Sequence, residues 1–234
     1  MKNNAHTILT INGGSSSIKF ALYGYNEPLQ QLFVGQIESI GTKNATLSFV
    51  NMATNQSGDI QLNTATYDES IDFLINWLTQ QQEFALLKAI GHRIVFGMKH
   101  TNAVVITTAL LNELKEMSIY DPEHLPLEIK LIELFQKRYP GLVQIACFDT
   151  SFHSNMPPVA RWGPIPRRYN AKGIQRYGFH GLSYAYLMEE LKAAAGTETA
   201  NGKIILAHLG NGASMAAIKE GRSIDATMLF SPGS

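Results

Sequence analysis

The sequence predicts an α/β protein with a duplicated architecture. Two apolar, β-rich runs, Ile8–Leu22 and Ile205–Ile218, lie near opposite ends of the chain, and each encloses a Gly/Asn/Ser turn. Between them, strand-like runs come first and then alternate with helical segments, an order typical of α/β folds. Because the second run begins as the first one does, we expect a second unit that repeats the opening of the first.

The composition indicates a globular protein with a sizeable core. The chain has 234 residues, of which 45% are hydrophobic and 16% are charged, enough for one or two domains. Lys and Arg together number 19, as do Asp and Glu, so nothing favours nucleic acid or an anionic membrane as a partner. Cys147 is the only cysteine, which fits a cytoplasmic location. No apolar stretch approaches the roughly 20 residues of a membrane helix, and residues 1–12 are interpreted as leading into a strand, not as a signal peptide.

Strands dominate the first part of the chain. Apolar and β-branched runs predict them over residues 7–12, 17–25, 30–38, 45–50 and 58–63. Residues 67–80 have apolar positions on one helical face, with Asp68 placed to cap the helix. Further strands at 87–95, 103–107 and 143–148 then alternate with helices at 110–117 and 127–139.

A second domain is expected after these elements. Residues 154–176 are rich in Pro, Gly and Arg and show no clean period, so we interpret them as a connector and loop. A helix at 183–195 follows, and then strands at 203–209, 214–219 and 222–228. We therefore divide the chain into a first domain at 1–153 and the start of a second domain at 154–234, which we expect to be incomplete because no closing helix follows.

The first turn, NGGSSSIK at residues 12–19, has the composition of a phosphate-binding loop. Small residues let backbone N–H donors approach a phosphate closely. In strand geometry Ser15, Ser17 and Lys19 would share one face, and Asn12 could reach a metal-bound water. An ordinary surface hairpin with a solvated lysine is the alternative, but a second, similar turn favours two half-sites that face one polyphosphate.

Two charged residues lie at or near strand ends. Arg93, in GHRIVFG, has apolar neighbours, and a buried guanidinium usually binds a carboxylate or phosphate, although an internal Arg–Asp pair is equally compatible. Asp149, in FDTSFH, follows a strand at the end where α/β folds collect reactive groups. An Asx-turn or a helix cap is the alternative for this aspartate.

Two histidines lie beside glycines. His180, in RYGFHG, is at an expected helix start, where the backbone favours anions and an imidazole tends to stay neutral. His208 directly precedes the second Gly-rich turn. A lone histidine is usually structural, but two in such settings favour donation to a developing phosphoryl charge.

Five motifs, NGGSSSIKF, GHRIVFG, FDTSFHSNMP, RYGFHG and HLGNGAS, occur in an order that resembles the acetate kinase family nearly from end to end. The resemblance implies a ribonuclease-H-like, actin-like duplicated fold, with the first domain largely present. It implies reversible, Mg²⁺-dependent phosphoryl transfer between ATP and acetate, which gives acetyl phosphate and ADP. A propionate- or butyrate-type acyl kinase and a truncated, inactive binding module are the alternatives.

The resemblance also implies a role for each matching residue. Asp149, Arg93 and His180 would be catalytic, and Asn12 would lie near Mg²⁺. The residues expected to contact the phosphates of ATP are Ser15, Ser17, Lys19, His208, Leu209, Gly210, Asn211 and Gly212. The acyl pocket would be lined by Arg93, Val95, Phe179 and Pro232.

The chain also departs from the family pattern. Glu123 stands where the family commonly has an apolar pocket residue, and we expect it to face out of the pocket, with His124 as its nearest candidate partner. Tyr184 stands where the family tends to have a histidine. Family members continue well beyond Ser234 and are commonly homodimers, and the further part holds adenosine-binding and catalytic groups, so we expect this chain alone to be inactive. We expect it to self-associate because no later helix covers the apolar face of the strands at 203–228.

Overall fold

The computed structural model describes residues 6–63, 66–210 and 212–231. The chain forms two compact units. Unit 1 comprises Met1–Arg93 and Val105–Ala146, and unit 2 comprises Ile94–Val104 and Cys147–Ser234. The division into domains at residue 153 stays a prediction.

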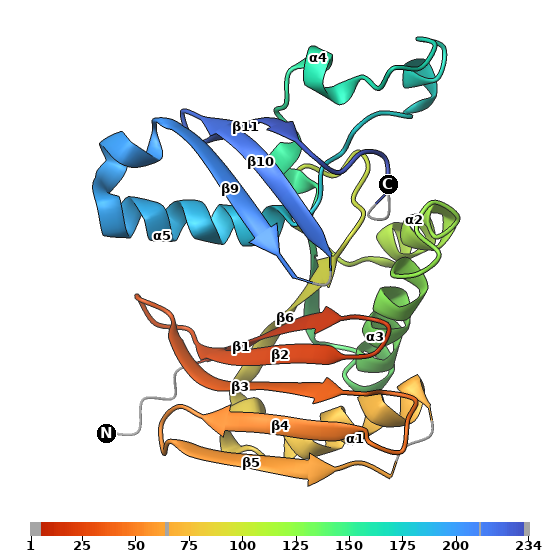
Figure 1. Ribbon diagram of the computed structural model, residues 1–234. Coiled ribbons are helices and arrows are strands. Elements are labelled where there is room, and N and C mark those ends of the chain that lie inside the picture. The colour runs from red at the N-terminus through yellow and green to blue at the C-terminus, as the bar shows by residue number, and fades with distance from the viewer. Residues whose placement is uncertain (1–5, 64–65, 211, 232–234) are drawn as a thin grey trace. The chain divides into compact units, whose positions relative to one another are not determined.

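The larger sheet has eight strands in the order β5-β4-β3-β2-β1-β6-β8-β7. The first five strands form an antiparallel meander, and β6 joins β1 in parallel (Figure 1). The predicted strands are confirmed with small shifts at their ends: β1 (Thr7–Gly13), β2 (Ile18–Gly24), β3 (Gln30–Glu38), β4 (Thr46–Asn51), β5 (Gln56–Gln61), β6 (Leu87–Ile94), β7 (Val104–Val105) and β8 (Val143–Phe148). Side chains of β1 alternate between buried and more exposed positions, as a strand with one covered face requires.

Helices cover one face of this sheet. The predicted helices are confirmed as α1 (Tyr67–Thr79), α2 (Thr108–Met117) and α3 (Leu125–Arg138), and the short 3₁₀ turn η1 (Gln82–Leu86) lies between α1 and β6. Trp77 of α1 packs its ring against Phe20, Phe33 and Phe49 of three neighbouring strands, at centroid distances of 5.7, 6.2 and 4.9 Å. Leu131 and Phe135 of α3 join the same core. Burial of these apolar side chains is the main force that holds the helices on the sheet.

The helix α1 begins with a different cap from the one predicted. Thr66 is the N-cap: its hydroxyl accepts a hydrogen bond from the Glu69 N–H, and the Glu69 carboxylate accepts one from the Thr66 N–H. Asp68 lies inside the first turn and forms an ion pair with Lys130 of α3. The expected cap at Asp68 was wrong. The residue just before the helix, Thr66, forms a capping box with Glu69, and this box already supplies partners for the free N–H groups at the helix start.

Unit 2 contains a three-stranded antiparallel sheet, β9 (Lys203–Leu209), β10 (Ala213–Lys219) and β11 (Arg222–Ala226), with α5 (Gly181–Ala200) along one face (Figure 1). Tyr184 of α5 packs with Ala216 and Ile218 of β10 in a small core. On the other face Ile205 is 74% exposed. The predicted helix end at residue 195 is reflected in Gly196, whose φ of 84° interrupts the helical backbone.

The predicted connector at 154–176 contains two short helical elements. It contains the short helix α4 (Pro158–Arg161) and the 3₁₀ turn η3 (Asn170–Lys172). Pro158 starts α4 with a preset φ, and Gly173 ends η3 with a φ of 84°. The pattern was missed because each element is about one turn long, too short to show a helical period.

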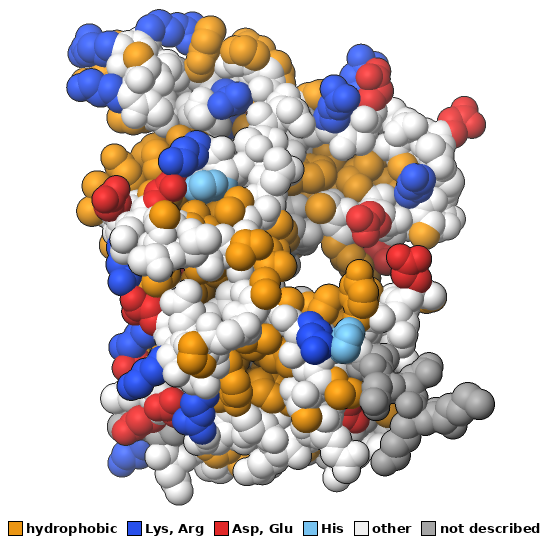
Figure 2. All heavy atoms as spheres, turned by 180° about the vertical axis from the view of Figure 1, so that it is seen from behind, with side chains coloured by type: hydrophobic (Ala, Val, Ile, Leu, Met, Phe, Trp, Pro, Cys, Tyr) orange, Lys and Arg blue, Asp and Glu red, His pale blue; other side chains and the backbone are white. Residues whose placement is uncertain are grey.

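Arginine–aromatic contacts order this segment. The Arg167 guanidinium lies 4.1 Å from the Trp162 ring centroid, and that of Arg168 lies 4.8 Å from the Tyr169 ring centroid. Figure 2 shows Lys and Arg side chains gathered beside hydrophobic ones on the part of the surface that carries α4 and η3. Such cation–π contacts contribute about 0.5–1 kcal/mol each at exposed sites. They therefore organise a segment that has little core of its own.

Candidate active site

The first Gly-rich turn joins β1 to β2 and sets Asn12 opposite Lys19 in the strand register. The Gly14 N–H donates to the Ser17 carbonyl at 2.8 Å and closes the turn. The strand geometry assumed for Ser15 and Ser17 was wrong, because β2 begins only after the closed turn, so a common face for Ser15, Ser17 and Lys19 stays a prediction. Ser15 and Lys19 are exposed, and Ser17 is partly buried.

Arg93 lies on β6, which pairs in parallel with β1. Its Nη1 donates to Asn12 Oδ1 at 2.9 Å, and the side chain is only partly buried. The sheet therefore brings together three residues that the sequence singled out, Asn12, Lys19 and Arg93. Two of the three are cations, so this half-site suits an anion.

An Asp–His pair that sequence reasoning missed lies before α3. Asp121 is buried, and its Oδ1 lies 2.8 Å from Nδ1 of His124. The hydrogen bond to Asp121 raises the pKa of His124, while the nearby charge of Arg93 lowers it. Glu123 is exposed, and its orientation relative to an acyl pocket stays a prediction. His124, the partner suggested for it, forms its hydrogen bond with Asp121, while the charge of Glu123 also raises the pKa of His124. The three-residue spacing between Asp121 and His124 at a helix start was the available signal.

In unit 2, Asp149 directly follows β8, as predicted. Its N–H donates to the Ile94 carbonyl and its own carbonyl accepts from the Gly181 N–H, both at 2.9 Å. A Cβ at Gly181 would lie 2.0 Å from that carbonyl oxygen. Glycine at this position is therefore what lets the start of α5 approach the buried aspartate.

The two predicted histidines lie together in unit 2. His180 is the N-cap of α5, with a left-handed φ of 59°, a backbone state that is uncommon outside glycine and recurs at functional sites. Its ring stacks on that of His208 with a centroid distance of 4.1 Å and an interplanar angle of 23°. His180 Nδ1 lies 2.8 Å from Ser214 Oγ, and His208 Nδ1 lies 3.0 Å from Ser183 Oγ.

The other imidazole nitrogens face the second Gly-rich turn. A Cβ at Gly212 would lie 3.5 Å from Nε2 of His180, and one at Gly210 would lie 4.0 Å from Nε2 of His208. Asn211, also predicted here, lies outside the described residues.

A buried histidine holds the segment that precedes His180. His153, in the 3₁₀ turn η2 (Ser151–His153), is within 3.0 Å of the Phe179 carbonyl through Nε2 and within 2.8 Å of Ser223 Oγ through Nδ1. A carbonyl can only accept, so Nε2 carries the proton and Ser223 donates to Nδ1. Burial lowers the pKa of His153, which keeps the ring neutral.

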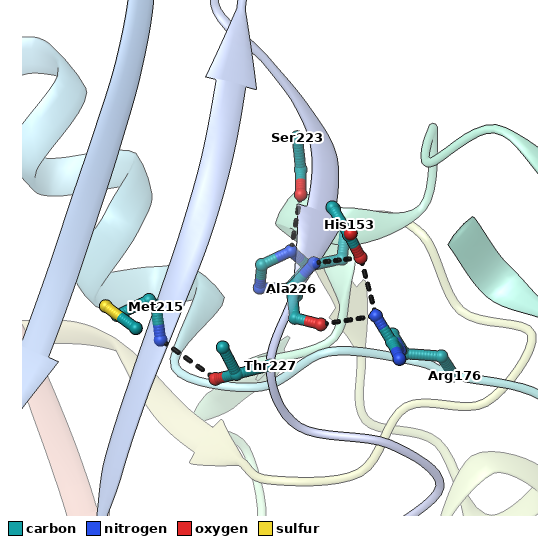
Figure 3. Close-up of polar contacts among 7 residues, drawn as sticks. His153, Arg176, Met215, Ser223, Ala226 and Thr227 are labelled. Atoms are coloured by element: carbon teal, nitrogen blue, oxygen red, sulfur yellow. Dashed lines mark hydrogen bonds and ion pairs between the residues drawn. The ribbon is translucent and has the colours of Figure 1, made fainter. Parts of the chain in front are cut away.

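Ion pairing fastens the same segment to β11. The Arg176 guanidinium contacts the Asp225 carboxylate at 2.5 Å and the Ala226 carbonyl at 2.7 Å, and the Met215 N–H donates to the Thr227 hydroxyl (Figure 3). The Arg176 contacts fix the backbone that leads to His180, and the Met215–Thr227 bond joins β10 to the residue that follows β11. Single-sequence motifs gave no signal for any of them.

The apolar residues suggested for a substrate pocket are partly described. Val95 and Phe179 are buried in unit 2, and the Phe179 ring stacks on Phe96 at a centroid distance of 5.9 Å. Leu209, suggested as a nucleotide contact, is 79% exposed. Pro232 lies outside the described residues, so the pocket role of this set stays a prediction.

Two further features concern metal ligands and helix length. Among the described residues no group of His, Cys, Asp or Glu side chains comes together as a metal site. The Asn12 amide oxygen already accepts a hydrogen bond from a cation, so it does not by itself fit the first coordination sphere of Mg²⁺. Within the same residues, no helix has the length and apolar character that a membrane span requires.

Comparison with known proteins identifies the family. The model described as the Acetokinase family matches residues 7–234. The chain belongs to this family. It is 40% identical over 228 residues to the acetate kinase of Rhodopseudomonas palustris strain TIE-1 and 39% identical over 235 residues to that of Borrelia duttonii strain Ly, and it covers 57% of the length of each. In turn, the matches cover 95% and 96% of this chain.

Solved members of the acetokinase family share the fold. A propionate kinase from Francisella tularensis superposes with a TM-score of 0.86 at 34% identity, and the acetate kinase of Porphyromonas gingivalis does so with 0.81 at 30%. Both matches cover 97% of this chain and 58% of the solved one. The predicted α/β fold is thereby confirmed as the one that these acetate and propionate kinases share, and the chain spans a little over half the length of its relatives.

Proposed function

We propose that the chain is part of an acetate kinase, which transfers a phosphoryl group reversibly between ATP and acetate and so forms acetyl phosphate and ADP. The observation that carries this proposal is the family match over residues 7–234, which includes both Gly-rich turns and all five motifs. Phosphoryl transfer needs little covalent chemistry from the protein and depends on positioning and charge stabilisation. The cations and imidazoles of the two half-sites are suited to those tasks.

In this proposal Arg93 binds the anionic substrate. Its planar guanidinium can donate two parallel hydrogen bonds to a carboxylate or phosphoryl group, and Asn12 orients it from the neighbouring strand. Lys19 neutralises phosphate charge, and the hydroxyls of Ser15 and Ser17 donate from the exposed turn. Val95, Phe179 and Pro232 line the acyl group.

In unit 2, His180 donates to the phosphoryl oxygens as charge develops in the transition state. His208 and the turn through Gly210, Asn211 and Gly212 contact the nucleotide phosphates, with Leu209 beside them. Asp149 acts as the catalytic acid–base or as a positioning residue, and its buried setting supports either role.

Magnesium enters the proposal as part of the ATP substrate. Mg²⁺ is usually held by substrate phosphates, water and one or two carboxylates, and the described residues offer no ready-made carboxylate cage. Asn12 is proposed to contact a metal-bound water at most. We also propose a cytoplasmic location, supported by the single cysteine, and no nucleic-acid partner, supported by the balanced charge. A homodimer is proposed only for the full-length family member, on the family resemblance.

Propionate is a second candidate substrate. The structural match to a protein named propionate kinase favours it, with its TM-score of 0.86. Acetate and propionate differ by one methylene, which changes transition-state binding by only about 1–3 kcal/mol. The rates with the two acids therefore have to be measured side by side.

The test is acyl phosphate formation, measured as the hydroxamate with ATP, Mg²⁺ and acetate, propionate or butyrate. It is applied to the 234-residue chain and to the chain extended by the reading frame that follows codon 234. We expect activity from the extended chain and none from the shorter one. An extended, folded chain that forms no acyl phosphate with any of the three acids would overturn the proposal and favour a binding module.

A further inference from the structure

The backbone on both sides of His180 is held by the short segment that follows β8. The Gly181 N–H, in the peptide group that follows His180, donates to the Asp149 carbonyl at 2.9 Å. The Phe179 carbonyl, in the peptide group that precedes it, lies 3.0 Å from Nε2 of His153. The end of β8 and the turn η2 therefore hold both peptide groups that meet at His180.

The contact between His153 and Phe179 has only one possible direction. A carbonyl oxygen has no proton to give, so Nε2 of His153 is the donor. This holds whether the ring is neutral or charged, because the Ser223 hydroxyl, 2.8 Å from Nδ1, can either donate to that nitrogen or accept from it. His153, Ser223 and Phe179 are each only 1% exposed. Loss of the donor would thus leave a buried carbonyl without a partner, which is unfavourable.

The surroundings of His153 hold its ring in place. The rings of Phe152 and Tyr184 lie nearly perpendicular to it, with centroid distances of 5.4 and 5.6 Å. On another side the backbone of Gly178, with a φ of 71°, comes so close that a Cβ there would lie 2.5 Å from Cγ of His153. The donor is therefore fixed, and glycine lets the segment before His180 pass directly beside it.

The direction of the Phe179 carbonyl bears on the backbone state of His180. A peptide group is rigid and planar, so holding its carbonyl also fixes the N–H on the other side, which belongs to His180. Rotation of this plane changes φ of His180, and its value of 59° is costly for a residue with a side chain. Such a state persists only where surrounding contacts enforce it. In this state the His180 ring stacks on that of His208.

We propose that His153 is a positioning residue, whose Nε2–H holds the Phe179–His180 peptide group in the orientation that stacks the His180 ring on that of His208. In the proposed kinase, on which the catalytic part of this inference rests, the same bond places the His180 imidazole for phosphoryl transfer. A displacement of about 1 Å in such a group can cost about 100-fold in rate.

Nitrogen-15 NMR of the 234-residue chain tests the donor without any need for turnover. The chain has seven histidines, so selective histidine labelling gives few signals, and the signal that is lost in His153→Gln belongs to His153. We expect a protonated Nε2 at this residue. A ring whose only proton is on Nδ1 has no donor for the Phe179 carbonyl and would overturn the proposal, whatever the variants do.

A matched pair of variants then tests what the donor does. Gln and Met side chains are similar in length, but only Gln can place an N–H close to the former Nε2. Stacked rings shift the signals of each other's carbon-bound protons, so His180→Gln supplies the unstacked position of the His208 signal. We expect this signal to move most of the way to that position in His153→Met and to stay near the wild-type position in His153→Gln. Ser223→Ala is the control: it removes the other hydrogen bond of His153 but keeps the donor, and the His208 signal should stay in place.

Two results would rule the proposal out. One is a folded His153→Met chain in which the His208 signal is that of the wild type. The other is a His153→Gln chain that loses the stacking, since the donor would then not be what maintains it. If His153→Met does not fold, the wild-type tautomer and the His153→Gln signal still decide the question.

Kinetics of the extended chain test the catalytic consequence. His153→Met should lower kcat by about 10- to 100-fold with little change in KM for ATP or acetate, and His153→Gln should recover most of the loss. If the NMR signals behave as expected but no form of the protein makes acyl phosphate, the proposed function fails and the positioning of His180 stands. If turnover is present and kcat is unaffected in His153→Met, the catalytic part of the inference fails.

Discussion

The two Gly-rich hairpins are similar in sequence but present different chemistry. The β1–β2 hairpin places Asn12 and Lys19 opposite each other, and Arg93 reaches Asn12 from the parallel neighbour β6. The β9–β10 hairpin instead faces two stacked imidazoles, each held by a serine hydroxyl. The first hairpin therefore brings two cations to its surroundings, and the second brings two imidazoles.

The two hairpins also differ in how well the sheet around each of them is covered. The β1–β2 hairpin lies inside a sheet of eight strands, with helices over one face. The β9–β10 hairpin lies in a sheet of three strands, and the face away from α5 exposes Ile205, Leu209 and Met215. A turn motif alone predicts neither the charge of a half-site nor how well its sheet is covered. Both follow from the strands and helices that lie beside it.

The largest expected effect is the loss of the cationic clamp. In an active form, Arg93→Ala should lower kcat/KM by on the order of 100- to 1,000-fold because it removes a charged donor from the transition state. Arg93→Lys should recover little, since an ammonium lacks the planar fork. The matched control is Arg138→Ala, which removes an exposed guanidinium that also donates to an asparagine, Asn76. Near-normal kinetics in both Arg93 variants would rule out the clamp.

The next prediction compares how tightly the backbone is packed at a glycine near each of the two half-sites. Gly181→Ala should lower the free energy of unfolding by about 3 kcal/mol or more, because the new Cβ would lie 2.0 Å from the Asp149 carbonyl oxygen. Gly13→Ala should cost only about 1 kcal/mol, since its Cβ would meet the Tyr67 hydroxyl at 2.9 Å, at the far end of a side chain. Urea denaturation of both variants measures the difference. Equal losses would contradict the close approach of α5 to Asp149.

The sequence predicted the elements well and the contacts between them poorly. Strands such as β1 and β8 were predicted because apolar and β-branched runs dictate extended structure locally. The cap at Thr66 was missed because it depends on a reciprocal bond with Glu69. The second strand was predicted to begin at Ser17 instead of Ile18, because the extent of the turn depends on the Gly14–Ser17 hydrogen bond. The His180–Ser214–Tyr184 contacts lay beyond reach for a stronger reason. They join residues about 30 positions apart, and only the packing of α5 on β10 brings them together.

A smaller effect concerns the open face of unit 2. The 234-residue chain should self-associate through this face, because exposed apolar side chains at neighbouring strand positions favour association. Ile205→Ser should weaken association by about tenfold, since burial of such a side chain is worth about 1.5–3 kcal/mol. Ile119→Ser, at a position that is 75% exposed in unit 1 and lies in no strand, should leave it unchanged. Light scattering at several concentrations makes the comparison, and a wild-type chain that stays monomeric throughout contradicts it.

The smallest effect tests whether the first half-site is cationic beyond Arg93 and Lys19. The Asp121 hydrogen bond raises the pKa of His124, so the folded state favours the imidazolium more than the unfolded state does. The resulting stabilisation is present below the unperturbed pKa of 6.5 and is lost as the pH rises through the raised, folded value. The wild type should therefore have a higher free energy of unfolding than Asp121→Asn. This difference should be largest below pH 6.5 and should become smaller as the pH rises above 6.5. His124→Gln should remove this pH dependence altogether. Because a third of the His124 side chain is exposed, solvent screens the pair, and this change should rank below the others. Urea titrations at several pH values measure this difference. A difference that does not change with pH would mean that His124 is not charged beside Asp121, and Arg93 and Lys19 would then be the cations on which the description of the first half-site rests.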